Sequence, residues 1–287
     1  MKHPIYPANR EIYKYLHDLY DSRHAALTIS IVGGGGKTHL AFWLASLFKL
    51  HGHRVCITTT TKMYLPDDAR LDHIVALDND HTAFNTRQLA QRLWQENPLD
   101  HAPAITFLYK SILPASSADE ADKVQGLTYK QLDSYRQAGL FTVFIVEADG
   151  AKQLPIKAPS RHEPCIVTDS DVVIGVTGAE AILSSAQPDR IHRWSEFAAI
   201  TQCEPQAVID QSVLQRLITN PDGMFKGSPP NARRIWVINK CDLSPNQEAL
   251  LKLAEQLTNQ IPELSSVWLT SFHAPSPIQC VFLNGSL

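Results

Sequence analysis

Four consecutive glycines followed by lysine and threonine have the residue types and order of a phosphate-binding loop. They are Gly33, Gly34, Gly35, Gly36, Lys37 and Thr38, between an apolar run at 27–32 and a helix-like stretch that reaches Leu50. Glycine lets backbone N–H groups approach an anion without a Cβ in the way, and a helix N-terminus adds the positive end of its dipole. Lys37 can reach terminal phosphates, and the Thr38 hydroxyl can bind Mg²⁺. The pattern predicts a nucleoside triphosphate or another phosphorylated ligand, with Lys37 exposed in the loop.

The spacing of this loop departs from the common pattern, in which four residues separate the first glycine from Gly-Lys-Ser/Thr. The first glycine of that pattern would fall on Ile31, so the sequence fits a shorter form, Gly33-x-x-Gly36-Lys37-Thr38, similar to that of Mur-type ligases. The alternative is a flexible glycine turn, which the Lys-Thr pair at a helix start disfavours. The loop by itself leaves the identity of the nucleotide open.

A second motif has the residue types with which GTPases read guanine. It consists of Asn239, Lys240, Cys241 and Asp242, directly after an apolar, β-branched run at 234–238. A carboxylate at Asp242 can accept hydrogen bonds from guanine N1–H and the 2-amino group, which adenine lacks. Asn239 can tie this motif to the glycine loop, and Ser271, further along the chain, can support the base. The alternative is an ordinary turn in which Asp242 caps a helix.

Two acids, Glu147 and Asp149, follow a third apolar run, at 141–146. Such a run is typical of a central parallel strand, and an acid at its end commonly helps a phosphate-loop threonine to hold Mg²⁺. Residues two apart on a strand face the same side, so either acid can hold the metal while the other orients a water. We therefore expect Lys37, Glu147 and Asp149 to act in catalysis, and Thr38, Glu147 and Asp149 to surround the metal. A solvated turn is the alternative.

Four threonines, at 58–61, follow an apolar run at 54–57. Threonine has a high β propensity, so these residues fit a plain strand end. The functional alternative is that one or two of their hydroxyls face the terminal phosphate or its metal ion. Both interpretations stay open from the sequence alone.

Composition limits the classes of function. The chain has 287 residues, 44% of them hydrophobic, and a net charge of −3, which allows one large α/β domain with a substantial core. Positive residues form no basic stripe for nucleic acid, and no apolar stretch has membrane-spanning length. Five scattered cysteines and no secretory leader favour reduced thiols in the cytoplasm.

Strand-like and helix-like runs alternate along the chain, which predicts an α/β fold with a doubly wound, mostly parallel sheet. The expected strands are 27–32, 54–59, 72–77, 104–109, 141–147, 171–176, 234–239, 266–270 and 278–283. The expected helices are 8–21, 37–50, 85–95, 127–138, 178–184, 204–218 and 245–260. We expect residues 1–24 to add an N-terminal helix to a single phosphate-loop domain at 25–287, with a loop-like flap at 110–128.

Several motifs, taken in order, resemble the YqeC family. They are the glycine loop, 58–63, 146–152, 155–159, 162–164, 173–176, 191–193 and 239–242, and the resemblance spans about residues 28–260. The resemblance implies a cytoplasmic phosphate-loop protein that acts as an accessory factor of selenium-dependent molybdenum hydroxylases. It also makes Lys152, Lys157, Arg161 and His162 candidates for a second anionic ligand, such as a molybdopterin phosphate. A solvated basic loop is the alternative.

These observations lead us to expect a Mg²⁺-dependent nucleotide hydrolase that prefers GTP to ATP and drives a conformational switch in maturation of a molybdenum hydroxylase. Gly33 to Gly36, Lys37 and Thr38 would hold the phosphates, and Asn239, Lys240, Asp242 and Ser271 the base. Two alternatives stay open: an ATP- or GTP-dependent transferase that modifies a cofactor, and a noncatalytic chaperone that binds molybdopterin dinucleotide. The expected partners are the nucleotide and a molybdopterin cofactor or a molybdenum hydroxylase, with neither nucleic acid nor membrane.

Overall fold

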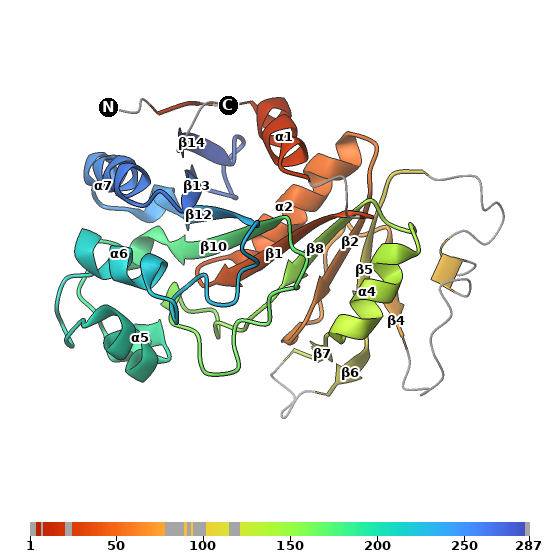
Figure 1. Ribbon diagram of the computed structural model, residues 1–287, viewed down its shortest axis with the longest axis horizontal. Coiled ribbons are helices and arrows are strands. Elements are labelled where there is room, and N and C mark those ends of the chain that lie inside the picture. Colours follow the sequence, from red (N-terminus) through yellow and green to blue (C-terminus); the bar gives the residue numbers. More distant parts are fainter. Residues whose placement is uncertain are drawn as a thin grey trace.

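The structure, a computed structural model, describes residues 4–6, 8–20, 25–77, 89, 90, 93, 102–114 and 121–284. Its central sheet has the strand order β14-β13-β12-β10-β1-β8-β2-β5-β4 (Figure 1). The strands are β1 (Leu27–Gly33), β2 (Arg54–Thr59), β4 (His73–Ala76), β5 (Ala104–Tyr109), β8 (Val143–Glu147), β10 (Val172–Gly178), β12 (Arg233–Asn239), β13 (Leu264–Thr270) and β14 (Ile278–Leu283). Neighbouring strands are parallel except β13 and β14. The predicted mostly parallel sheet is confirmed.

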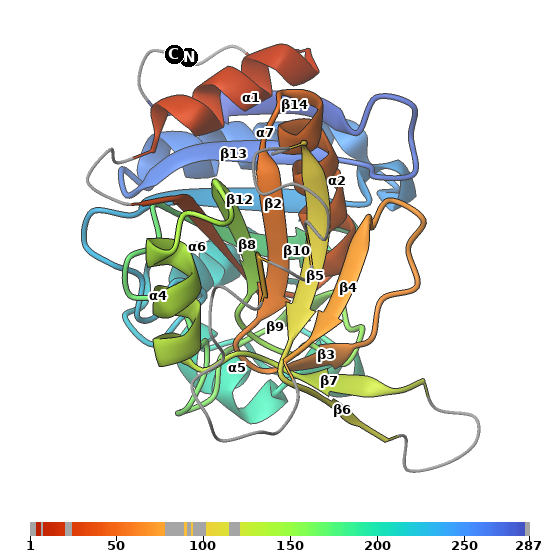
Figure 2. The ribbon, with the colours of Figure 1, turned by 90° about the vertical axis from the view of Figure 1, so that its right-hand side faces the viewer.

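Helices cover both faces of this sheet (Figures 1 and 2). On one face lie α1 (Asn9–Asp18) and α2 (Lys37–Leu50), and on the other α4 (Tyr129–Gln137), α6 (Gln211–Thr219) and α7 (Gln247–Gln260), with α5 (Trp194–Thr201) packed on α6. Ile145 of β8 belongs to the core beneath α2, whereas the next residue back, Phe144, packs under α4. Successive strand residues point to opposite faces, so one continuous apolar run supplies both cores.

The carboxyl ends of the parallel strands bring the predicted site segments together. β1 lies between β10 and β8, with Ile31 paired to Glu147 and Gly33 paired to Val176. β12 lies beyond β10 and pairs Asn239 with Gly178. In an open α/β sheet, ligands bind at this edge, where the chain leaves the strands. The glycine loop, the two acids at the end of β8 and the motif at the end of β12 therefore share one edge of the sheet.

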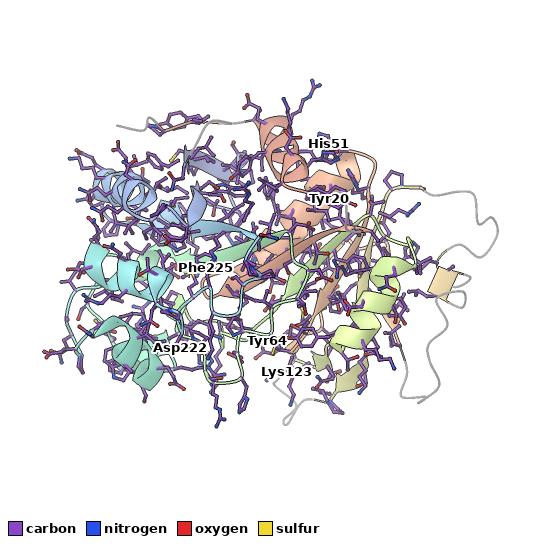
Figure 3. The ribbon with its side chains drawn as sticks, in the orientation of Figure 1. Tyr20, His51, Tyr64, Lys123, Asp222 and Phe225 are labelled. Carbon is purple, nitrogen blue, oxygen red and sulfur yellow. The ribbon has the colours of Figure 1, made fainter. Side chains whose placement is uncertain are left out.

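The predicted flap at 110–128 contains two short strands, and its residues 115–120 lie outside the described residues. β6 (Ser111–Leu113) and β7 (Lys123–Gln125) form a small antiparallel sheet with β3 (Lys62–Tyr64). Figure 3 shows Tyr64 and Lys123 side by side, and the Lys123 ammonium lies 5.0 Å from the Tyr64 ring centroid. These strands are only three residues long, so they carry too little periodicity to be predicted from sequence.

The helix predicted at 178–184 is wrong. The structure has a short 3-10 turn there, at Ala179–Ala181. Leu183 has a left-handed conformation, with φ of 58°, which an α-helix cannot accommodate. The segment therefore leaves β10 as a turn, and this turn brings Glu180 to the carboxyl edge of the sheet.

The helix predicted at 204–218 begins later than expected, as α6. Asp210 Oδ1 accepts the N–H of Val213 at 3.0 Å and so caps its first turn. α5, the preceding helix, was not predicted, and the helix predicted at 85–95 lies for the most part outside the described residues. None of the helices in the described part of the chain combines the length and apolar character needed to cross a bilayer.

Candidate functional site

The glycine loop is pressed against neighbouring backbone, which excludes any larger residue. A Cβ on Gly34 would lie 2.6 Å from the Leu154 carbonyl oxygen, and one on Gly35 would overlap the backbone of Gly178. Gly36, directly before Lys37, has φ of 120°, a conformation that L-residues with side chains rarely adopt. The run of glycines is therefore a steric requirement of this close approach.

Three loop amides hold the loop in place. The N–H of Gly33 donates to Asp149 Oδ2 at 3.0 Å, that of Gly34 to the Val176 carbonyl at 2.9 Å, and that of Gly35 to the Leu154 carbonyl at 3.0 Å. The first amides of a helix have no acceptor within the helix, and here they belong to the turn that begins at Lys37. The N-terminus of α2, rather than the early glycines, is thus the part of the loop that can receive an anion.

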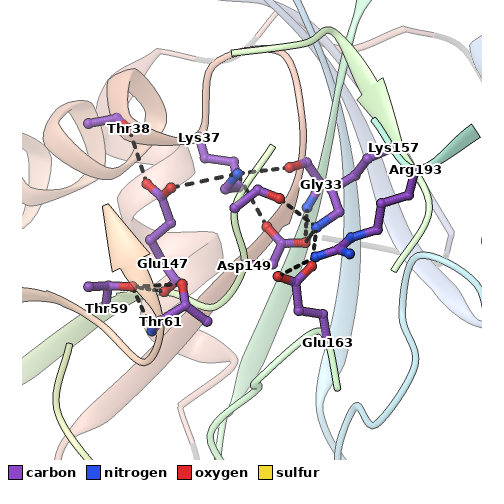
Figure 4. Close-up of polar contacts among 11 residues, drawn as sticks. Gly33, Lys37, Thr38, Thr59, Thr61, Glu147, Asp149, Lys157, Glu163 and Arg193 are labelled. Atoms are coloured by element: carbon purple, nitrogen blue, oxygen red, sulfur yellow. Dashed lines mark hydrogen bonds and ion pairs between the residues drawn. The ribbon is translucent and has the colours of Figure 1, made fainter. Parts of the chain in front are cut away.

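Lys37 is buried, with 5% of its side chain exposed, and not exposed as the sequence led us to expect. Its ammonium donates to the Gly33 carbonyl at 2.8 Å and lies 3.2 Å from Asp149 Oδ1 and 3.6 Å from Glu147 Oε1 (Figure 4). Burial acts to lower the pKa of Lys37, but the charges of Asp149 and Glu147 outweigh it and raise the pKa above its ordinary value. The two acids after β8 thus hold the lysine charged inside the protein.

Glu147 and Asp149 have different partners. Glu147 Oε2 accepts a hydrogen bond from the Thr38 hydroxyl at 3.0 Å. Asp149 Oδ2 accepts the Gly33 N–H, and its Oδ1 has no hydrogen-bond partner within the described residues besides the ion pair with Lys37. Glu147 is therefore the acid closest to the hydroxyl that was predicted to bind a metal. Asp149 lies against the loop, and the Lys37 ammonium is the group that faces its Oδ1 within the described residues.

A chain of ion pairs runs from Asp149 away from the glycine loop (Figure 4). Lys157 Nζ lies 3.0 Å from Asp149 Oδ2 and donates to Glu163 Oε2 at 2.7 Å. Arg193 in turn lies 2.9 Å from Glu163 Oε1. Lys157 is buried, and its ammonium is held by two carboxylates. The other members of the predicted second anion site, which are Lys152, Arg161 and His162, are exposed to solvent.

The four threonines at 58–61, which span the end of β2, bond mainly to backbone. The Thr58 hydroxyl donates to the Leu108 carbonyl at 2.6 Å, that of Thr59 to the Glu147 carbonyl at 2.7 Å and that of Thr60 to the Cys165 carbonyl at 2.7 Å. Thr59 thereby braces the strand end that carries Glu147. These contacts favour the plain structural interpretation of the threonines over one in which their hydroxyls face a phosphate.

Asn239 joins the second motif to the glycine loop, as the sequence led us to expect. Its amide Nδ2 donates to the Gly35 carbonyl at 2.8 Å, and its Oδ1 accepts a hydrogen bond from the Thr270 hydroxyl at 3.1 Å. The side chain is 3% exposed, so this link is part of the folded core. Thr270, at the end of β13, was not predicted as a site residue.

The remaining residues of the second motif lie closer to solvent. Lys240 donates to Glu180 Oε1 at 2.6 Å, and Asp242 is exposed. The backbone N–H of Asp242 donates to the Ser271 hydroxyl oxygen at 3.2 Å, so the segments that follow β12 and β13 are in contact. Glu180 was missed because its segment was assigned to a helix. Glu180 lies two residues beyond the buried strand β10, and an acid near the end of a buried strand is the signal that identified Glu147.

Two histidine rings are in contact at the carboxyl edge of the sheet. The rings of His39, in the first turn of α2, and His273, after β13, have centroids 5.1 Å apart. Burial lowers the pKa of His39, and the charges of His273 and Arg70 add to the effect. Both rings are exposed, so this pair lies at the surface between the first turn of α2 and the segment that follows Ser271.

The donor set fits Mg²⁺ bound together with phosphate. Thr38 and Glu147 offer hard oxygen atoms next to each other, which is the ligand type that Mg²⁺ prefers. The described residues contain no group of three or more His, Cys, Asp or Glu side chains that could hold a metal ion. A cation here would depend on phosphate oxygens and water for its remaining ligands, as Mg²⁺ does in nucleotide sites.

Comparison with known proteins agrees with the motif pattern. The sequence model of the family described as "YqeC protein" matches residues 29–195, more than half of the chain. A curated relative from Escherichia coli strain K12, with the name "Uncharacterized protein YqeC", is 34% identical over 266 residues, which cover 89% of this chain and 91% of the relative. The chain belongs to the YqeC family. The YqeC match contains the glycine loop, both acids after β8 and the ion pairs as far as Arg193, and it ends before Asn239.

Proposed function

We propose that this YqeC chain binds a nucleoside triphosphate with Mg²⁺, prefers GTP to ATP, and hydrolyses the terminal phosphoanhydride bond. The observation that carries the proposal is the grouping of ammonium, hydroxyl and carboxylate at the start of α2. Glu147 lies 3.0 Å from the Thr38 hydroxyl and 3.6 Å from the Lys37 ammonium. A cation, a metal-binding hydroxyl and an acid at a helix N-terminus are the parts that phosphoryl transfer uses.

Each residue has a role that follows from its contacts. Hydrolysis adds water to the terminal phosphorus and breaks its bond to the bridging oxygen. Lys37 exchanges its carboxylate partners for phosphate oxygens and offsets the charge that develops there. Thr38 and Glu147 hold Mg²⁺, which supplies further neutralisation of that charge when bound. Asp149, whose Oδ1 lacks a hydrogen-bond partner within the described residues, accepts a hydrogen bond from the attacking water.

The preference for guanine rests on the motif after β12. Asp242 is exposed at the carboxyl edge of the sheet, and Lys240 stands beside it with its ammonium on Glu180. Asn239 fixes the distance between this motif and the glycine loop through its bond to Gly35. A carboxylate at Asp242 matches the two donors on the guanine edge and leaves adenine unmatched, and Ser271 supports the turn.

The cellular role that we propose comes from the family resemblance. It is an accessory role in the cytoplasm during maturation of a molybdenum hydroxylase, in which hydrolysis drives a conformational switch. A cofactor-modifying transferase and a chaperone for molybdopterin dinucleotide use the same loop for a different ligand. Turnover of free GTP separates the hydrolase from both.

The test is release of inorganic phosphate from GTP and from ATP by the purified protein, with and without Mg²⁺. We expect Mg²⁺-dependent turnover of GTP and a lower kcat/KM for ATP. Thr38→Val, which removes the hydroxyl and keeps the shape, should abolish turnover because the metal loses a ligand. Thr219→Val, on the exposed side of α6, is the matched control and should leave the rate unchanged. Absence of phosphate release with GTP bound would favour the chaperone.

A further inference from the structure

Positive charges gather on the side of Asp149 away from Lys37, and the proposed hydrolysis does not use them. β9 (Ile156–Lys157) pairs in parallel with β11 (Ile191–His192), which sets His192 beside Lys157. Arg193 follows directly, as the residue that precedes helix α5. Sequence motifs pointed to the 152–162 side of this group, and only the pairing of the two short strands adds His192 and Arg193 to it.

The negative charges in this region are already shared. Asp149 pairs with both Lys37 and Lys157, and Glu163 pairs with both Lys157 and Arg193. Lys152 has no ion pair within the described residues, although its charge is close enough to act on His192. Lys152, Lys157 and Arg193 thus lie around Glu163 and the outer oxygen of Asp149, which favours a positive potential at the surface end of the chain of ion pairs, although Glu196 in the first turn of α5 adds a carboxylate beside Arg193.

The pKa of His192 reflects the cations around it. Burial lowers the pKa of its imidazole to about 4, and the charges of Lys157 and Arg193, with a further contribution from Lys152, add to the lowering against the opposing effect of Glu163. The ring is partly buried and has no side-chain hydrogen bond within the described residues. A neutral imidazole held among cations can donate one N–H to an anion without adding to the local repulsion.

Arg193 also has unused donors. One terminal nitrogen of its guanidinium pairs with Glu163, while its Nε is buried and has no partner within the described residues. Arg193 is also the N-cap residue of the eight-residue helix α5, so the first amides of this helix lie next to it. No side chain accepts a hydrogen bond from these amides as a cap. Guanidinium, imidazole, ammonium and helix amides together present donors of the kind that bind phosphate.

We propose that Lys152, His192 and Arg193 form a second anion site, which takes the phosphate or pyrophosphate group of a small molecule other than the nucleotide. The chain of ion pairs from Arg193 through Glu163 and Lys157 to Asp149 connects this site to the glycine loop. An anion on Arg193 competes with Glu163, which changes the partners of Lys157 and, through it, those of Asp149. This coupling to the loop rests on the proposed nucleotide site, whereas the anion site itself does not.

Inorganic phosphate is the probe, followed by ³¹P NMR line broadening and by calorimetry in protein without nucleotide. We expect two classes of phosphate site. Lys37→Met should remove one class, and Lys152→Gln with Arg193→Gln should weaken the other at least tenfold. Lys226→Gln is the matched control, because it removes a nearby lysine whose charge is paired with Asp222 at 3.3 Å. Arg193→Lys, which keeps the charge, should restore part of the affinity.

The outcomes distinguish the two proposals. Loss of all phosphate binding in a Lys37→Met protein that urea unfolding shows to be folded overturns the second site, as does equal weakening by Lys226→Gln. Unchanged binding in Lys37→Met together with loss in the double variant supports the second site and rejects the glycine loop as an anion site. Because Arg193 pairs with Glu163 and its loss can unfold the region, the exposed single variant Lys152→Gln provides the same comparison in a chain whose fold is not at risk.

Discussion

The two halves of the candidate site are built in different ways. In the phosphate half, Lys37 and Asp149 are almost completely buried, and every charge faces an opposite charge within 3.6 Å. In the base half, Asn239 and Ser271 are buried to that degree, whereas the two charged residues are not: Lys240 is 34% exposed and Asp242 is open to solvent. The family model covers the phosphate half and ends before the base half, whereas the match to the Escherichia coli relative covers 89% of the chain.

This difference indicates which side chains of the site are held in position before a ligand binds. Buried ion pairs hold Lys37, Glu147 and Asp149 in place before a ligand arrives, and preorganised charge is the largest contributor to transition-state stabilisation. An exposed Asp242 is hydrated until a base covers it, so its hydrogen bonds to the ligand replace bonds to water and yield a small net gain. Reaction type should therefore be harder to change by mutation than nucleotide preference.

The largest effect is expected for Lys37→Met. Nucleotide binding should be lost, and the two carboxylates left without their buried partner should destabilise the fold by about 3–5 kcal/mol. Calorimetric titration with GTP, GDP and ATP, together with urea unfolding, measures both. Lys49→Met is the matched control on the same helix, because its pair with Asp72 is at the surface and is worth less than about 1 kcal/mol. Unchanged nucleotide affinity in a folded Lys37→Met protein contradicts the proposal that Lys37 binds the phosphates of the nucleotide.

The next effect separates the two acids. Glu147→Gln should raise the Mg²⁺ concentration needed for turnover, because Glu147 is the acid beside Thr38. Asp149→Asn should instead slow the chemical step at saturating Mg²⁺ by tenfold or more, about 1.4 kcal/mol, because it orients the water. Single-turnover hydrolysis at several Mg²⁺ concentrations distinguishes them. Equal behaviour of the two variants would show that the different contacts of Glu147 and Asp149 have no functional meaning.

A smaller effect is expected in the base half. Asp242→Asn turns one acceptor into a donor, so guanine loses a partner and xanthine, with a carbonyl at position 2, gains one. Because Asp242 is exposed, the preference for XTP over GTP should shift by about 1 kcal/mol, the low end for a mismatched polar group. Competition binding of GTP, XTP and ATP measures it, with Asp222→Asn as the control. A wild-type preference for ATP, or an unchanged order in the variant, rejects guanine reading.

The smallest effect concerns His192 and the pH dependence of stability. Its pKa is lowered to about 4, so between pH 4 and the ordinary value of 6.5 the unfolded chain binds a proton that the folded chain does not. The free energy of unfolding therefore falls as the pH decreases through this window. His192→Asn should flatten that slope without changing stability at pH 8. Urea unfolding at pH 4.5, 6 and 8 provides the comparison, and an unchanged slope places His192 outside the cluster of cations.

The sequence by itself determined the parallel sheet and the residues at its carboxyl edge. Apolar runs of strand length alternate with helical runs, and such alternation has few compact solutions. Because the ends of parallel strands meet at one edge, the pattern of runs alone predicted that Glu147 and Asp149 lie near the glycine loop and that Asn239 reaches it. The bond from Asn239 to Gly35 meets that expectation.

Only the tertiary structure decided which charged side chains form ion pairs with one another. The burial of Lys37, the bond from Lys157 to Asp149 and the pairing of His192 with Lys157 join residues whose sequence separations carry no periodic signal. A motif names a lysine but cannot say whether a carboxylate or solvent faces it, since that depends on strand order and on where turns such as Ala179–Ala181 place their side chains. Local pattern sets the elements, and long-range packing sets which charges they bring together.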